Sequence, residues 1–169
     1  MGLIINKTIP MLMKGYPTVS DKYNVAGGTL EGTAPAMFGE LVQFGSTAGY
    51  FKAINATNTI AAVTSAAGII VATNVKAAEN FPGTVVQVNP GEAFNLLVNG
   101  FIAVELASTA TASEVTANAA VYVTGAGKFT TTSDSAKLAE ALPNAVYTGM
   151  KENKGTADAP KWFAEIYVK

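Results

Sequence analysis

The chain of 169 residues contains no histidine, no cysteine and no arginine. Without histidine it lacks the commonest general base and metal ligand. Without cysteine it has no thiol nucleophile, no disulfide framework and no thiolate zinc site. These absences argue against an enzyme, and we expect no catalytic residue, no metal site and no cofactor.

Charge is also scarce, because charged residues make up 14% of the chain against about 25% in a typical soluble protein. The net charge is −1, and every positive side chain is a lysine. Nucleic-acid binding needs a basic stripe, and base readout relies above all on arginine. We therefore expect no nucleic-acid partner. A weakly charged surface suggests that partners cover much of it; the alternative is that Thr, Asn and Ser supply the polarity.

Long apolar runs are missing as well, although 49% of the residues are hydrophobic. No segment reaches the roughly 18 apolar residues of a membrane helix. The N-terminus lacks the basic start of a signal peptide, and its apolar run is broken at Asn6 and Lys7. We therefore expect no membrane partner and synthesis in the cytoplasm of a host cell.

The first 37 residues differ from the rest of the chain. Pro10, Gly15 and Pro17 interrupt this segment too often for a helix or a long strand. We predict an extended N-terminal arm over residues 1–37 and a single β-rich domain over residues 38–169. The arm has apolar side chains that we expect to contact a neighbouring subunit; these are Met11, Leu12, Met13 and Tyr16. The alternative is that the arm folds back over its own domain.

Short alternating runs begin at Phe38 and are typical of β-strands. Glu40–Phe44 and Tyr50–Ile54 flank a glycine-containing turn, which predicts a hairpin. A second hairpin is predicted around Gly125-Ala126-Gly127, between two strand-like runs.

The clearest turn signal is Asn99-Gly100, because both residues tolerate the positive φ angles of a type I′ turn. It predicts a third hairpin, with Ala93–Val98 and Phe101–Leu106 as its strands. Alternation in the return strand places Ile102, Val104 and Leu106 toward a core and leaves Glu105 in water.

The remaining segments complete an all-β pattern. Residues 55–67 form a loop or a weak helix, Ser133–Leu142 is predicted as one helix, and the last strand is Trp162–Val168. Nine or ten short strands with frequent Gly, Pro and Asn turns favour an antiparallel sandwich or barrel, jelly-roll-like, with at most one or two short helices.

Candidate chemical motifs fail when they are tested. Gly127-Lys128 lacks the P-loop's earlier glycine, where Tyr122 stands, and its Ser or Thr, where Phe129 stands. The acids that might form a hydrolytic pair each stand alone and are expected to be solvated or paired with lysine; these are Glu40, Glu92, Glu105 and Glu165. Some aromatic residues suit a sugar-binding face, but on alternating strands they are more often core; these are Phe94, Phe101, Tyr122, Tyr147 and Trp162.

The order of features in the second half of the chain carries a resemblance. Pro90-Gly91-Glu92 precedes an apolar strand, and Val121-Tyr122-Val123-Thr124 leads to a glycine turn. Tyr147-Thr148-Gly149 then precedes a last strand, Ala164–Val168. This order resembles that of the capsid cement or decoration proteins (head stabilisation proteins) of tailed bacteriophages.

The resemblance implies a structural virion protein on the exterior of a phage capsid. Such a protein would bind the major capsid protein, cement neighbouring subunits and stabilise the head, and it would form a homo-oligomer, either a dimer or a trimer. In that setting the arm residues named above would contact the capsid or another subunit. Two alternatives remain open: another structural β-module of a tail, fibre or pilus, and a carbohydrate-binding module that uses Trp162 and surface tyrosines.

Overall fold

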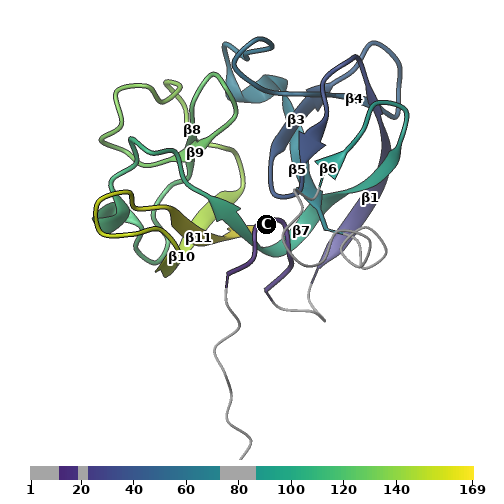
Figure 1. Ribbon diagram of the computed structural model, residues 1–169. Coiled ribbons are helices and arrows are strands. Elements are labelled where there is room, and N and C mark those ends of the chain that lie inside the picture. The colour runs from purple at the N-terminus through teal and green to yellow at the C-terminus, as the bar shows by residue number, and fades with distance from the viewer. Residues whose placement is uncertain (1–11, 19–22, 73–86) are drawn as a thin grey trace, which may run out of the picture.

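The computed structural model describes residues 12–18, 23–72 and 87–169, and these residues form an all-β fold (Figure 1). They contain two short 3₁₀ turns, η1 (Val63–Ser65) and η2 (Ala112–Glu114), and no α-helix. The strands are β1 (Asn24–Glu31), β2 (Ala36–Met37), β3 (Leu41–Phe44), β4 (Tyr50–Ala53), β5 (Ala66–Val71), β6 (Gln87–Val88), β7 (Ala93–Glu105), β8 (Tyr122–Val123), β9 (Phe129–Thr130), β10 (Ala145–Asn153) and β11 (Trp162–Val168). The expected all-β class is confirmed.

Five strands close into a small barrel. The hydrogen-bonded order β1-β4-β3-β5-β7 returns to its start because β1 also pairs with β7. Every pairing in the ring is antiparallel except β1 with β4. The barrel interior is filled by alternate side chains of its strands, and its buried members include Leu30, Val42, Phe51, Ile70, Phe94 and Leu96.

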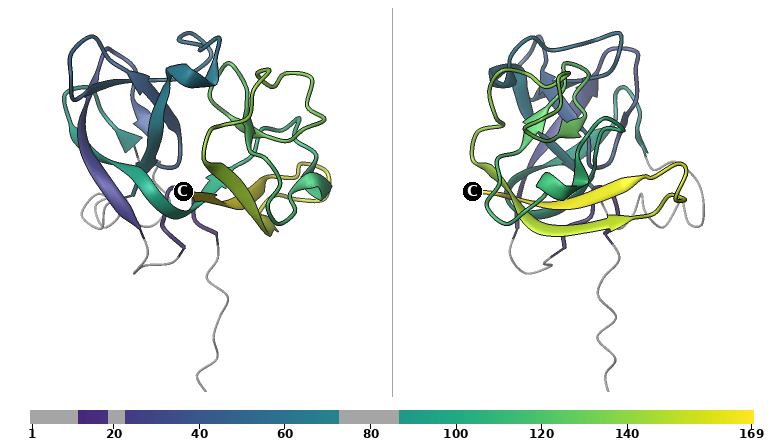
Figure 2. Two further views of the ribbon diagram at one scale, coloured as in Figure 1. Left: turned by 180° about the vertical axis from the view of Figure 1, so that it is seen from behind. Right: turned by 90° about the vertical axis from the view of Figure 1, so that its left-hand side faces the viewer.

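Strand β7 is the shared element of the molecule. Its first half pairs with β1 and β5 in the barrel, and its second half pairs with β11, which pairs in turn with β10. Figures 1 and 2 show β7 curving through the middle of the molecule, between the barrel and the lobe that holds β8 to β11. Residues from both lobes form one core, which includes Ile69, Leu97, Ile102, Val123, Tyr147 and Ile166.

The hairpin predicted at Asn99-Gly100 is wrong. These residues lie inside β7, and Gly100 has a φ of 133°. Leu97 is paired with strands of the barrel, whereas Ile102 is paired with Ile166 of β11, so the two flanks have partners other than each other. The tolerance of glycine for this φ lets the strand bend from one sheet into the next instead of reversing.

Of the other local predictions, two hairpins are confirmed and one helix is wrong. The hairpins β3–β4 and β8–β9 are confirmed by their antiparallel registers. The helix predicted over Ser133–Leu142 is wrong, because backbone amides of this segment donate hydrogen bonds to carbonyls at and beside β8. The amides of Leu138 and Leu142 donate to the carbonyls of Val123 and Val121 at 2.8 and 2.7 Å, which takes the donors that a helix would use.

The described part of the N-terminal segment lies on its own domain. The amide of Gly15 donates to the carbonyl of Ala103 in β7 at 2.8 Å, and the amide of Ala103 donates to Tyr16 at 3.2 Å. Residues 24–37 contribute β1 and β2, and therefore belong to the sheets of a domain expected to begin at residue 38. Residues 1–11 and 19–22 of the predicted arm lie outside the described residues.

Candidate docking surface

Among the described residues, no group of three or more acidic side chains is placed to hold a metal ion. The helical segments of that part of the chain are also too short to cross a bilayer. The features that remain as candidates for function are a row of charges, the anchored N-terminal segment and an apolar groove.

Five alternating charges form a row that ties the N-terminal segment to the domain. Lys14 lies 3.1 Å from Glu40 and 3.7 Å from Glu105. Lys128 approaches Glu40 to 2.8 Å, and Lys161 approaches Glu105 to 3.3 Å. The lysine partners expected for these two glutamates are confirmed. Because Lys14 stands between both carboxylates, the row fixes the segment to β7 and to the start of β3.

Glu40 is the best-buried acid of this row. Burial acts to raise the pKa of Glu40, but the charges of Lys14 and Lys128 and the Met37 amide outweigh it, so the pKa lies below its usual value. The carboxylate therefore stays ionised at neutral pH and holds both lysines.

Glu165 departs from its prediction. It is buried, with 5% of its surface exposed, and it accepts a hydrogen bond from the hydroxyl of Thr148 at 2.7 Å. It is neither solvated nor paired with a lysine among the described residues. The alternation of β11 that faces Ala164 and Ile166 to the core puts Glu165 on the other face, where Thr148 of β10 covers it.

Leu12 is the fixed root of the N-terminal segment. Its side chain is 3% exposed and packs with Ala103 and Phe163. Its amide donates to Glu152 at 3.0 Å, and the ammonium group of Lys154 donates to its carbonyl. Both backbone polar groups of Leu12 are thereby held by side chains of the β10–β11 hairpin region.

The four predicted contact residues have different surroundings. Met11 lies outside the described residues, and Leu12 is buried on its own domain. Tyr16 is partly buried against the barrel core, whereas Met13 exposes 43% of its surface. The structure therefore places one of the four, Met13, with a largely accessible side chain in the described part of the chain.

The N-terminal segment also packs very closely against the backbone at Phe38 and Gly39. Gly15 and Gly39 both have positive φ angles, 79° and 73°. A Cβ atom on Gly15 would lie 2.5 Å from Cβ of Phe38 and 2.6 Å from the nitrogen of Gly39. Only glycine fits this crossing without displacing backbone.

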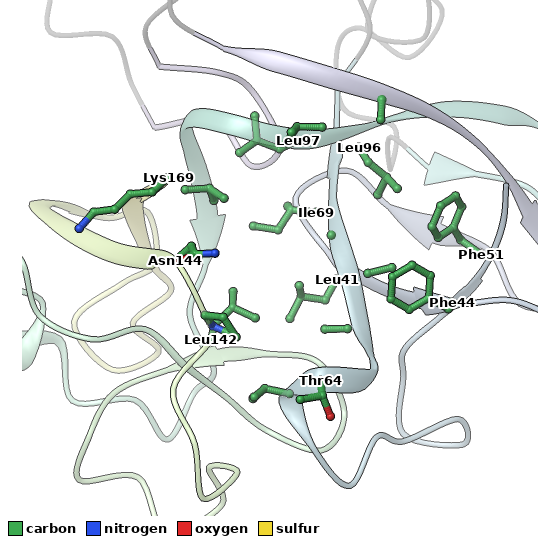
Figure 3. A pocket seen from close by; sticks show the side chains of 18 residues that line it. Leu41, Phe44, Phe51, Thr64, Ile69, Leu96, Leu97, Leu142, Asn144 and Lys169 are labelled. Atoms are coloured by element: carbon green, nitrogen blue, oxygen red, sulfur yellow. The ribbon is translucent and has the colours of Figure 1, made fainter. Parts of the chain in front are cut away.

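An apolar groove of about 560 Å³ opens at one end of the barrel and extends over β5 onto the shared core (Figure 3). Phe44, Phe51 and Leu96 lie on the barrel side of β5, and Leu41 and Leu142 lie toward the second lobe. The groove crosses β5 at Ala66–Gly68, where small side chains leave the space open. Lys169 supplies the charged side chain at its margin.

Two exposed apolar side chains, Phe44 and Val98, line this groove. Of the seven large hydrophobic residues that are exposed in the described part of the chain, five lie on or next to barrel strands. They are Tyr23, Val25, Phe44, Tyr50 and Val98. Phe44 and Val98 are the most exposed, at 64% and 53%. The sequence offered no signal for this surface, because each residue sits in an ordinary strand pattern.

Two buried polar side chains serve the core rather than a site. The hydroxyl of Tyr147 donates to the carbonyl of Thr130 at 2.8 Å, and burial raises its pKa. Asp134 accepts hydrogen bonds from the hydroxyls of Thr130 and Thr109 at 2.5 and 2.7 Å. Burial acts to raise the pKa of Asp134, but these hydroxyls and the Ala136 amide outweigh it, and the pKa lies below its usual value.

Comparison with known families matches residues 5–166 to the family described as structural cement protein (E217 gp24/Pam3 gp6). Comparison with curated proteins gives no match. Among solved structures, the fold is similar to a chain from the capsid of Myoviridae phage XM1, with a TM-score of 0.58 and 17% sequence identity over 97% of this chain and 96% of that chain. At this identity the likeness shows a shared fold.

Proposed function

The chain belongs to the phage structural cement protein family, and we propose that it binds the outside of the phage head and bridges neighbouring major capsid protein subunits. The family membership carries this proposal. As a structural component of the capsid, the protein acts by contact area and position, which agrees with a fold whose described acids are paired, hydrogen-bonded or isolated.

The physical requirements of cementing match the surface of the molecule. A cement protein is repeated by symmetry over the shell, so a modest affinity per copy sums to a large stabilisation. The exposed apolar side chains on and next to the barrel strands supply area whose burial removes apolar surface from water. Low overall charge limits the desolvation that such a contact must overcome.

The N-terminal contact set remains part of the proposal. Met13 exposes 43% of its surface beside the anchored root, which supports a contact between this residue and a neighbouring subunit or the capsid. Met11 precedes the root in the sequence and stays in the proposed set. Leu12 and Tyr16 support this set by packing on their own domain and holding its backbone. We also expect the protein to self-associate into a dimer or a trimer, which sedimentation velocity would measure.

The test is addition of the purified protein to expanded capsids that lack it, followed by calorimetry and cryo-electron microscopy. We expect density on the outer surface at the junctions between capsid subunits, and a higher melting temperature of the shell. Met13→Glu should bind more weakly, whereas Met150→Glu, a similarly exposed control at 41%, should bind like the wild type. Saturating protein that leaves capsid melting unchanged would refute the function.

A further inference from the structure

One edge of the barrel wall lacks a partner strand among the described residues. On one side, β1 pairs with β7 from Asn24 to Thr29. On the other side it pairs with β4 only from Thr29 to Glu31. The edge over Asn24–Gly28 is therefore open in that part of the structure. An exposed edge of this kind presents backbone donors and acceptors that pair readily with another extended chain.

The open edge adjoins the apolar groove. Ala26 of β1 lines the groove together with Phe44 and Val98, which are the two most exposed large apolar side chains in the described part of the chain. Beyond them, Ala66–Gly68 of β5 leave room on the floor. A strand added beside β1 would direct every second side chain toward the groove, as the pleat of a sheet requires. Backbone pairing would then give affinity, and the groove would select apolar side chains.

The chain itself contains a segment with this chemistry. Residues 3–9 read Leu-Ile-Ile-Asn-Lys-Thr-Ile, in which Ile and Thr favour extended backbone. This segment lies within residues 1–11, which precede the anchored Leu12. Leu12 is a fixed root, and eleven extended residues span about 36 Å.

We propose that residues 3–9 of one copy add as a strand to the open β1 edge of a neighbouring copy, with alternate apolar side chains in its groove. The choice of a neighbour rests on the proposed function, since an arm that returned to its own barrel would link no subunits. The exchanged arm would connect cement subunits to one another, in addition to their contacts with the major capsid protein.

The absence of native cysteine allows a direct test by disulfide formation in the full chain. Ile5→Cys and Val98→Cys are made as separate single variants and mixed under mild oxidation. The control mixture replaces Val98→Cys with Ala157→Cys, in an exposed loop that does not line the groove. We expect disulfide-linked heterodimers at least about tenfold faster in the first mixture, with no capsid present. Equal rates in the two mixtures would overturn the proposal.

A second experiment distinguishes exchange of residues 3–9 between copies from docking of these residues within one copy. In the double variant Ile5→Cys/Val98→Cys, exchange gives linked dimers and longer chains, whereas a disulfide confined to one chain at all concentrations contradicts the proposal. Val98→Lys should lower the linking of Ile5→Cys to Ala26→Cys at least about fivefold, and Met150→Lys should not. These assays use no capsid, so a negative result would reject arm exchange without rejecting capsid binding. Likewise, a failure to bind capsids would not reject arm exchange.

Discussion

The crossing of Gly15 and Gly39 makes a sharp prediction about the N-terminal segment. Gly15→Ala adds a methyl group that must displace the backbone of Gly39 or the Cβ of Phe38. Gly49→Ala is the matched control, because Gly49 has nearly the same φ, 81° against 79°, but open space around its Cβ position. The two variants share the cost of a left-handed alanine and differ in the collision.

The expected magnitudes follow from these two terms. The left-handed backbone costs about 1–2 kcal/mol in both variants. The collision adds about 1–3 kcal/mol in Gly15→Ala, as overpacking of a tight site does. For a chain of this size, each kcal/mol shifts the melting temperature by about 2–4 °C. Gly15→Ala should therefore melt about 2–12 °C below Gly49→Ala.

Local undocking is the other way in which the chain can relieve the collision. Residues 12–18 would then leave β7, and the melting difference would be smaller. Hydrogen exchange detects this outcome, because the amides of Ala103 and Ala72 donate to the carbonyls of Tyr16 and Gly15. Both amides should exchange faster in Gly15→Ala than in Gly49→Ala. Equal melting together with equal exchange would refute the argument.

Three further predictions concern the core. Tyr147→Phe leaves the buried carbonyl of Thr130 without its hydroxyl donor and should lower the free energy of unfolding by about 1–3 kcal/mol in urea titrations. Gly100→Ala places a side chain at a φ of 133° in β7 and should cost about 1–3 kcal/mol, measured in the same way; an unchanged midpoint would contradict the bend. Asp134 has a lowered pKa, so its contribution to stability is present above the unfolded-state pKa and is lost as pH falls through the folded-state value. The wild type should therefore lose stability below about pH 4, and Asp134→Asn, less stable at pH 7, should show a smaller loss; parallel curves would argue against the assignment.

The sequence predicts the parts of the fold that local pattern decides. The β3–β4 hairpin follows from two alternating runs around glycines, and its registered pair of Phe44 and Phe51 confirms it. The β8–β9 hairpin follows in the same way from Gly127, which has a positive φ. In both cases the strands that flank the turn are each other's partners, so local information is sufficient.

The failures share a cause, which is pairing with distant chain. Asn99-Gly100 has the local chemistry of a turn. The residues after it pair instead with β11, which lies more than fifty residues further along the chain. The segment 133–142 has a helical pattern, but Val121 and Val123 take its amide donors. The groove likewise depends on where β5 and β7 meet, which no single window of sequence contains.

The continuity of β7 also bears on how the protein carries mechanical load. Neither lobe keeps its full set of strands if the other is removed, because thirteen consecutive residues serve both sheets. The two lobes should therefore melt as one cooperative unit. On a shell under tension, force that enters the protein through one lobe would reach the other directly along the backbone of β7.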